Sequence, residues 1–253
     1  MSPGALRVAV LFPDLLGTYG DGGNGLILAR RAEWRGVEVE LVQAVSDARV
    51  PAADIYCLGG GEDGPQVRAA RTLVDDGTLA ARVAEGAVVL AVCAGFQVVG
   101  RSFPGAGGEA HEGVGLLDIE TVKGTGSRAV GEVVSVAATD RGAPDLPTLT
   151  GFENHGGRTA LGADALPLAQ VRVGVGNGGG DGTEGALAGR IVGTYLHGPV
   201  LARNPALADL LLGWALGVAE FRPLDDVAAE SLRAERIGAN GRWRFRRRIR
   251  RRR

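Results

Sequence analysis

The sequence predicts an α/β fold with a central, mostly parallel sheet flanked by helices, and two observations lead to this class. Strand-like and helix-like runs alternate through the first hundred residues, and the strand-like runs are apolar on both faces. Strands of that kind belong to parallel sheets that helices cover on both sides. The 253 residues, of which 45% are hydrophobic, are enough to build such a core.

The elements of the first half follow one another as strand, helix, strand, strand, helix and strand. The first run is continuously apolar, the second has apolar residues at helical spacing and ends at Gly36, and three glycines stop the fourth run. We expect strands at Leu6–Phe12, Val37–Val42, Asp54–Leu58 and Ala87–Val92, and helices at Leu26–Trp34 and Val67–Val83.

The second half has shorter strand-like runs between glycine-rich turns, which predicts an antiparallel extension of the sheet. These runs are Leu116–Val122, Gly131–Ala137, Leu149–Glu153 and Val171–Val175. Gly174–Gly185 is expected to be a flexible loop. Ile191–Leu196 is a last strand, and Asn204 is expected to cap a helix at Pro205–Val218.

The C-terminus differs from the rest of the chain in charge. In Arg242–Arg253, nine of the twelve residues are arginine, which leaves 19 basic against 29 acidic side chains elsewhere. We expect one domain over residues 1–240 and a disordered, solvated tail over residues 241–253. The alternative is that the tail is attracted to an anionic membrane surface, with Trp243 and Phe245 as interfacial anchors.

Several classes of protein are not expected. No stretch approaches the ~20 apolar residues of a membrane span, and the N-terminus runs directly into a strand-like segment without a secretory signal. Two cysteines do not imply a disulfide framework, and no nucleic-acid-binding motif is present. We therefore expect a cytoplasmic protein, at the inner face of the plasma membrane if the tail binds lipid.

The sharpest local feature is Ala87–Gly100, where an apolar strand ends at Cys93 and small residues precede a helical pattern. This is the layout of a nucleophile elbow, although Ala91 stands where a glycine is usual. The nearby helix N-terminus favours a thiolate, and the Ala94 N–H would face a developing oxyanion. The alternative is that Cys93 is a small buried hydrophobe, as we expect for Cys57.

A nucleophilic cysteine needs a base, and the chain has three histidines. We prefer His197, because it follows the last strand at the same edge of the sheet. His155 lies in a polar turn, where it could be a hydrogen-bonded loop residue, a substrate contact or the base, and His111 is expected to be solvated. The turn Gly59–Gly61 could supply a second oxyanion donor, at Gly60, or could be no more than a flexible turn.

Three motifs in this order and spacing resemble the class I, triad-type glutamine amidotransferases, whose sheet is flavodoxin-like. They are GGGED from Gly59, AVCAGFQ from Ala91 and YLHGP from Tyr195. Within that class, the likeness is greatest to the cobyric-acid-synthase-like branch and its GatD-type glutaminase subunits. It covers residues 6–215 and is carried by the segments Phe12–Asn24, Gly151–Thr159 and His197–Pro205.

The resemblance implies a reaction. The amide carbon of glutamine would bond to Cys93, ammonia would leave, and water would hydrolyse the thioester to glutamate. Arg128 would pair with the α-carboxylate of glutamine. The implied substrate-binding residues are Arg128, Gly60 and Gln97, with Asn154 and His155 as further candidates.

The resemblance also implies a partner and a heterodimer. GatD-type subunits pair with the Mur-ligase-like subunit MurT, which uses the ammonia to amidate the D-glutamate of the lipid II stem peptide. ATP and Mg²⁺ are expected on that partner, and no cofactor or metal in this chain. Alternatives are a glutaminase subunit for another amidoligase, such as a cobalamin-precursor synthase, and a non-catalytic scaffold or glutamine sensor.

One departure from the family concerns the third catalytic residue. Most triad amidotransferases have a glutamate two residues after the histidine, and here that position is Pro199. We therefore expect the chain to hold only a dyad of Cys93 and His197, which an acidic residue of the ligase subunit completes. The isolated subunit is then expected to be a poor glutaminase.

Overall fold

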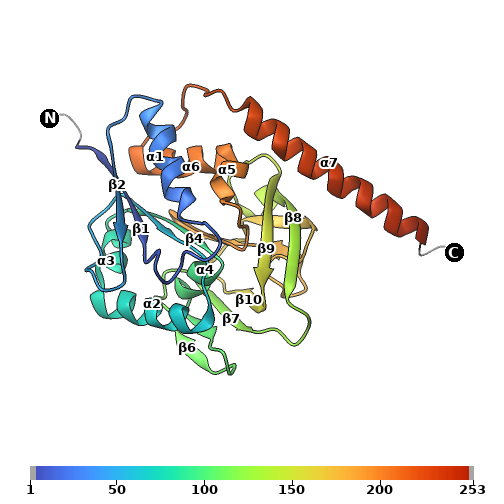
Figure 1. Ribbon diagram of the computed structural model, residues 1–253, viewed down its shortest axis with the longest axis horizontal. Coiled ribbons are helices and arrows are strands. Elements are labelled where there is room, and N and C mark those ends of the chain that lie inside the picture. Colours follow the sequence, from blue (N-terminus) through green and yellow to red (C-terminus); the bar gives the residue numbers. More distant parts are fainter. Residues whose placement is uncertain (1–3, 251–253) are drawn as a thin grey trace.

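A computed structural model describes residues 4–250 and has a six-stranded sheet at its centre (Figure 1). The strand order is β13-β14-β4-β3-β1-β2, in which all neighbours are parallel except β13 and β14. This confirms the predicted α/β fold with a mostly parallel sheet. The strands are β1 (Leu6–Leu11), β2 (Val39–Ala44), β3 (Ile55–Leu58), β4 (Val88–Val92), β13 (Ala186–Ala188) and β14 (Ile191–Thr194).

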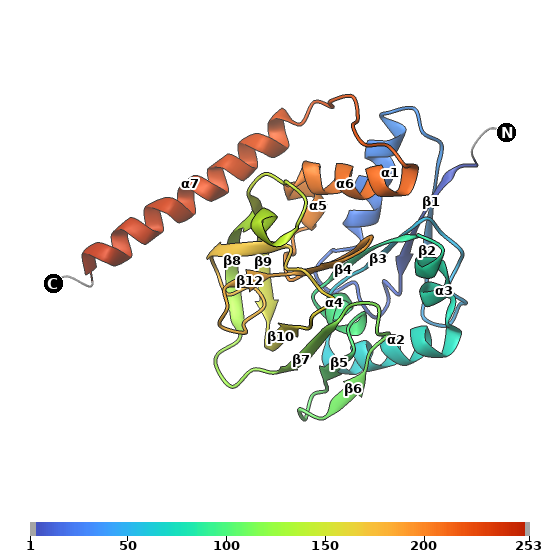
Figure 2. The same cartoon turned by 180° about the vertical axis from the view of Figure 1, so that it is seen from behind.

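Helices cover both faces of this sheet (Figures 1 and 2). One face carries α1 (Gly23–Glu33), α5 (Val200–Arg203) and α6 (Pro205–Leu216), and the other carries α2 (Asp63–Asp76), α3 (Thr78–Ala84) and α4 (Ala94–Val98). The single helix expected at Val67–Val83 is wrong, because Gly77 adopts a left-handed conformation (φ 69°) that ends α2 and starts α3.

The expected cap of α6 is only partly right. Asn204 is the residue before the helix, but its side chain makes no capping hydrogen bond. Its Oδ1 accepts from the Thr150 N–H at 2.9 Å, and its Nδ2 donates to the carbonyls of Thr150 and Val200, both at 2.8 Å. Asn204 therefore ties the strand β9 (Leu149–His155) to α5 instead of closing the first turn of α6.

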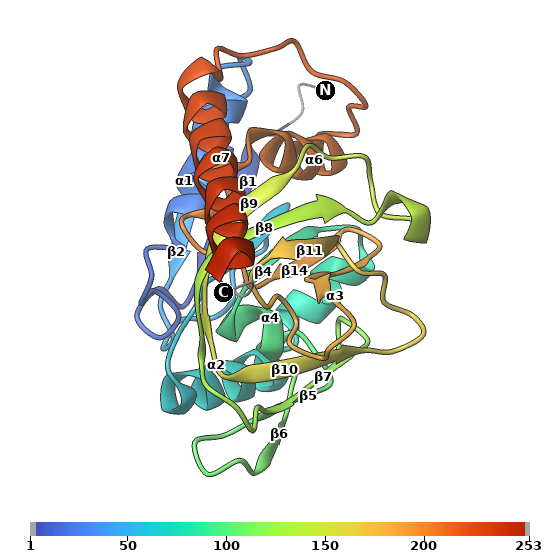
Figure 3. The same ribbon diagram turned by 90° about the vertical axis from the view of Figure 1, so that its right-hand side faces the viewer.

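The second half forms two further four-stranded sheets rather than one extension of the main sheet (Figure 3). Only β13 extends the main sheet with an antiparallel strand, and it is three residues long. One further sheet contains β10 (Gly157–Leu161), β7 (Ile119–Lys123), β5 (Ser102–Pro104) and β6 (Ala110–Glu112). The other contains β12 (Thr183–Glu184), β11 (Ala169–Val173), β8 (Ala129–Ala137) and β9 (Leu149–His155).

The C-terminal segment is tied to α1 before it leaves the body. The Arg31 side chain is 4% exposed and pairs with Asp209 at 2.8 Å and with Asp226 at 2.5 Å. Just after this contact, α7 (Val227–Arg250) begins and projects from the body (Figures 1 and 2).

The disorder expected for residues 241–253 stays a prediction. Residues 241–250 continue the helix α7, in keeping with the good helix propensity of arginine. The remaining three positions, 251–253, lie outside the described residues. No described helix has the length and apolar character to cross a membrane.

Candidate active site

The turn between β4 and α4 holds Cys93. β4 is fully buried between β3 and β14, and the Cys93 N–H donates to the Thr194 carbonyl at 2.9 Å. Cys93 has φ 52°, a conformation that a residue with a side chain adopts only under strain. A Cβ on Gly95 would lie 2.7 Å from Leu58 Cβ, so the turn needs a glycine there. This is the strand–turn–helix layout that the sequence predicts.

His197 follows β14 and contacts a carboxylate from the other end of the chain. Its Nδ1 lies 2.8 Å from Asp21 Oδ2, and the two side chains are 2% and 0% exposed. Because a carboxylate accepts, Nδ1 carries the proton and Nε2 is left as the basic nitrogen. Although Pro199 stands where a glutamate is usual, Asp21 of this chain contacts the ring, and the expected acidic residue of the ligase subunit stays a prediction.

Asp21 was missed because it lies 176 positions from its partner in a glycine-rich turn. A lone aspartate between glycines is typical of a solvated loop. The segment Phe12–Asn24, which contains Asp21, could have indicated this role, because it carries part of the family resemblance. The resemblance assigned no function to any residue of that segment.

The electrostatic surroundings of His197 favour its protonated form. Burial lowers the pKa of the ring, but the hydrogen bond with Asp21 and the interaction with the Cys93 side chain outweigh it and raise the pKa to about 9. Within the described part of the chain, the buried Nε2 has no partner at conventional hydrogen-bonding distance. The ring is thus placed to take a proton from the Cys93 thiol and hold it.

The glycine turn after β3 is arranged differently from the expectation. The Gly60 N–H donates to Asp21 Oδ2 at 2.9 Å, so it supports the histidine–aspartate pair rather than facing the pocket. A Cβ on Gly60 would lie 2.6 Å from His197 Cε1, which explains the need for glycine. Gly61 and Ala94 line the pocket beside Cys93, so Gly61 replaces Gly60 as the candidate for the second oxyanion donor.

A pocket of about 220 Å³ opens in front of Cys93. Its volume is enough for an amino acid. Among the residues that line it are Gly61, Cys93, Ala94, Gln97, Arg128 and His155. The structure therefore brings most of the predicted site residues to one cavity, while Gly60, Asn154 and His197 are not among those that line it.

Arg128 reaches the pocket from the loop before β8. Its Nε donates to Asn154 Oδ1 at 2.5 Å, and its Nη2 donates to the Asn154 carbonyl at 3.0 Å. The same carbonyl oxygen lies 4.0 Å from Cys93 Sγ. A guanidinium in this place can pair with the carboxylate of an amino acid.

Gln97 lies in α4, one turn after the nucleophile, and is 7% exposed. Its Nε2 donates to the Tyr195 hydroxyl at 3.0 Å, and its Oε1 accepts from Gln66 Nε2 at 2.8 Å. The Tyr195 hydroxyl is also 2.7 Å from Thr159 Oγ1. These contacts fix the floor of the pocket, so Gln97 presents a constrained polar surface to a ligand.

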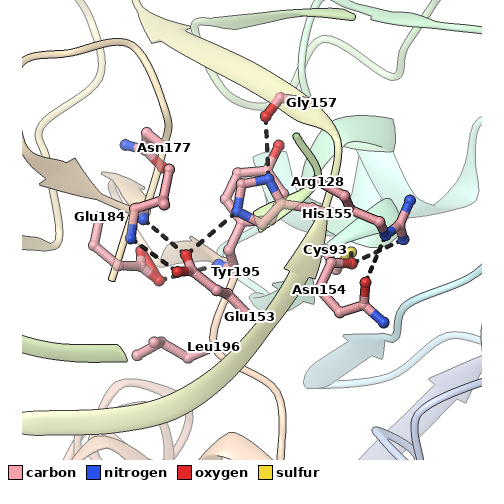
Figure 4. A network of polar contacts seen from close by, with 12 residues as sticks. Cys93, Arg128, Glu153, Asn154, His155, Gly157, Asn177, Glu184, Tyr195 and Leu196 are labelled. Carbon is pink, nitrogen blue, oxygen red and sulfur yellow. Dashed lines mark hydrogen bonds and ion pairs between the residues drawn. The ribbon is translucent and has the colours of Figure 1, made fainter. Parts of the chain in front are cut away.

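His155 lies in the pocket wall and belongs to a buried polar network (Figure 4). Its ring stacks on Tyr195 with a centroid distance of 3.7 Å, and its Nδ1 donates to the Gly157 carbonyl at 3.1 Å. Its Nε2 lies 3.5 Å from Glu153 Oε2. Of the roles left open for it, the structure favours a hydrogen-bonded wall residue over the catalytic base, because His197 holds the base position.

The segment Gly174–Gly185, expected to be a flexible loop, is held from within. The Glu153 carboxylate accepts the N–H groups of Val175 and Gly176 at 2.8 and 2.9 Å. Asn177 is buried and pairs with Gly185 through both ends of its amide. Burial raises the pKa of the neighbouring Glu184 to about 7. The loop is thus a structured support behind His155.

The remaining candidates are outside the site. Burial raises the pKa of the Cys57 thiol to about 12, so it is a packed and unreactive thiol. His111 is partly exposed and lies 3.1 Å from Glu109. Within the described residues, no group of His, Cys, Asp or Glu side chains is arranged to hold a metal ion.

A thiol at a strained strand-to-helix bend, with a buried histidine–aspartate pair beside it, is the arrangement expected of a nucleophilic cysteine and its base. The chain belongs to the family of CobB/CobQ-like glutamine amidotransferase domains, whose sequence model matches residues 7–205. This family was expected from the motifs and is confirmed.

Relatives of established name agree with this assignment. The chain is 37% identical to the lipid II isoglutaminyl synthase (glutamine-hydrolyzing) subunit GatD of Streptococcus pneumoniae over 85% of this chain and 82% of that protein. It is 36% identical to the GatD subunit of Staphylococcus aureus over 82% and 83%. It is also 37% identical to the cobyric acid synthase of Brucella canis, but over only 64% of this chain and 32% of that enzyme.

Solved structures support the fold. A glutamine amidotransferase from Thermotoga maritima has a TM-score of 0.54 at 16% identity, and the match covers 93% of this chain and 95% of that one. Another crystal structure of a glutamine amidotransferase has a TM-score of 0.56 at 18% identity, over 82% and 98%.

Proposed function

We propose that this chain hydrolyses L-glutamine through a thioester on Cys93 and supplies the ammonia to a Mur-ligase-like partner. That partner amidates the D-glutamate of the lipid II stem peptide in peptidoglycan synthesis. The observation that supports the chemistry best is the buried His197–Asp21 pair beside Cys93, at the end of a pocket that fits an amino acid.

The proposed reaction begins with transfer of the Cys93 proton to His197 Nε2. The thiolate attacks the side-chain amide carbon of glutamine, and the carbonyl oxygen becomes an oxyanion that the N–H groups of Ala94 and Gly61 face. His197 then gives its proton to the leaving nitrogen, and ammonia departs. Water, activated by the same ring, hydrolyses the thioester to glutamate. Asp21 holds the ring in the required tautomer throughout.

Arg128 gives the pocket its specificity in this proposal. Its guanidinium would pair with the α-carboxylate of glutamine, while Gln97 and the wall residue His155 bound the cavity on other sides. A positive charge at one end and a nucleophile at the other match a ligand that carries a carboxylate several bonds from its amide.

The choice of acceptor rests on the relatives. The GatD proteins are matched over more than four fifths of their length and are named as subunits, which implies a second subunit. The cobyric acid synthase is matched over only 32% of its length. We therefore favour a heterodimer with a MurT-type ligase that binds ATP, Mg²⁺ and lipid II, in the cytoplasm.

The test uses the purified chain with and without the co-expressed ligase. Wild-type protein should become covalently labelled at Cys93 by an electrophilic glutamine analogue, as read by mass analysis. The complex should amidate lipid II with glutamine, and Cys93→Ala should abolish that activity while free ammonium still supports it. Absence of labelling in the complex would favour a scaffold, and amidation of a cobalamin precursor instead would move the chain to the other amidoligase.

A further inference from the structure

We infer that Asn154 is a positioning residue that sets the affinity for glutamine by holding the Arg128 guanidinium in the pocket. The inference rests on the proposed function and assigns a role to a side chain outside the cavity wall. Asn154 touches both the arginine and a ring that packs on the catalytic histidine.

The backbone around Asn154 is fixed by its neighbours in β9. Side chains alternate along a strand, so Glu153 and His155 face one side and Asn154 faces the other. Figure 4 shows Glu153 and His155 within the buried network and Asn154 directed toward Arg128. Glu153 is anchored by two backbone N–H groups of the Gly174–Gly185 segment. The amide of Asn154 is therefore presented from a rigid strand.

Asn154 binds one edge of the guanidinium and leaves another free. Its Oδ1 accepts from Arg128 Nε at 2.5 Å and its carbonyl accepts from Nη2 at 3.0 Å. The end-on edge that includes Nη1 remains for a carboxylate. Within the described residues, no acidic side chain pairs with Arg128. A neutral amide thus orients the guanidinium without cancelling the charge that a ligand carboxylate needs.

The other end of the amide leads to the catalytic histidine. Asn154 Nδ2 donates to the Tyr19 hydroxyl at 3.1 Å, so the orientation of the amide is determined at both ends. The Tyr19 ring packs on His197 with a centroid distance of 4.6 Å. Contiguous contacts therefore join the arginine that would hold the α-carboxylate to the histidine that serves Cys93. Loss of the amide should loosen Arg128 first, because Arg128 is the more exposed of the two.

The test compares two electrophiles that react with the same sulfur. 6-Diazo-5-oxo-L-norleucine carries the α-amino and α-carboxyl groups of glutamine, and iodoacetamide carries neither. In Asn154→Ala, the second-order rate of labelling at Cys93 by the analogue should fall about tenfold or more, as for loss of a hydrogen bond to a charged group. The iodoacetamide rate should stay within about twofold of wild type. The KM for glutamine should rise more than kcat falls.

Two further variants separate positioning from damage to the fold. Arg128→Lys keeps the charge but lacks the fork that Asn154 binds, so it should show the same selective loss. In an Arg128→Ala background, Asn154→Ala should cause little further loss with the analogue, because it acts through the arginine. The matched control is Gln43→Ala, which removes an exposed amide on the edge strand β2 and should change neither rate.

The outcomes are distinguishable. Selective, non-additive loss of labelling by the analogue supports the inference. Equal labelling of wild type and Asn154→Ala by the analogue overturns it, as does a full additional loss in the Arg128→Ala background. If the analogue fails to label wild type in the complex, the proposed function fails and the inference falls with it.

Discussion

Replacement of Asp21 by asparagine tests the catalytic role of the buried carboxylate. The wild-type Oδ2 atom accepts two hydrogen bonds, from His197 Nδ1 at 2.8 Å and from the Gly60 N–H at 2.9 Å. An asparagine of the same shape can keep the bond from Gly60 through its oxygen. The same oxygen can accept from His197 Nδ1, but it belongs to a neutral amide and therefore stabilises the protonated ring less than the carboxylate does.

The size of the effect follows from the pKa of His197, which is raised from 6.5 to about 9. A difference of that size corresponds to roughly 3 kcal/mol between the protonated and neutral ring. Asp21 and Cys93 share this stabilisation, and burial opposes both. We therefore assign about 2 kcal/mol to Asp21, in the range of a hydrogen bond to a charged group. Asp21→Asn should lower kcat/KM for glutamine about thirtyfold.

The contribution of His197 to the stability of the fold depends on pH. A folded-state pKa above the unfolded value means that the protonated ring stabilises the fold below pH 6.5 and that this contribution is lost as the pH rises through 9. In Asp21→Asn the pKa of His197 should fall from about 9 toward its ordinary value, because burial then acts with less opposition. Glutamate release measures the rate, and NMR of the histidine ring carbons measures the titration.

Asp14→Asn removes a carboxylate of the same segment that binds Ser46 rather than a histidine, and should leave glutamine turnover unchanged. If Asp21→Asn keeps more than half of wild-type kcat/KM and His197 titrates as before, the triad is refuted. If the ligase subunit restores the variant fully, the third carboxylate comes from the partner after all.

Three further predictions concern the stability of the fold. Burial raises the pKa of Glu184 to about 7, so its protonated carboxyl stabilises the fold below pH 4.5 and this contribution is lost as the pH rises through 7. Between pH 5 and pH 8, the free energy of unfolding of Glu184→Gln, measured in urea, should therefore rise relative to wild type by roughly 1 to 3 kcal/mol. A smaller gain at the higher pH would contradict this. Cys93→Gly should be about 1 kcal/mol more stable than Cys93→Ala, since glycine relieves the strain at φ 52°, and equal melting temperatures would argue against strain. Arg31→Met should cost about 3 kcal/mol, because it leaves Asp226 without its cation and removes one of the two arginines that pair with Asp209. It should also expose residues 217–226 to limited proteolysis, whereas an unchanged digest would show that the segment is held by other contacts.

The sequence was sufficient where a feature depends on neighbouring residues. The run Ala87–Val92 is apolar throughout and small residues follow Cys93, so both the buried strand and the bend can be predicted from a dozen positions. His197 could be chosen because it ends the last strand at the same edge of the sheet. The helix at Val67–Val83 was predicted in the right place, but its periodicity continues across Gly77 and hides the break.

The sequence was insufficient where a feature depends on distant contacts or on the direction of one peptide group. Asp21 acquires its role only when His197 is folded beside it. Gly60 and Gly61 are alike in composition, and only the three-dimensional position of Asp21 decides which N–H it takes. The Gly174–Gly185 segment appears flexible because its anchor, Glu153, belongs to another strand.

The contact between Asp21 and His197 also bears on when the enzyme can first work. During synthesis the ribosome releases the aspartate early and the histidine 176 residues later, so a nascent chain carries the nucleophile long before its base. An unfinished chain therefore lacks the base that the proposed hydrolysis of glutamine needs. A fragment that ends before β14 should therefore have no glutaminase activity, even if its first strands fold.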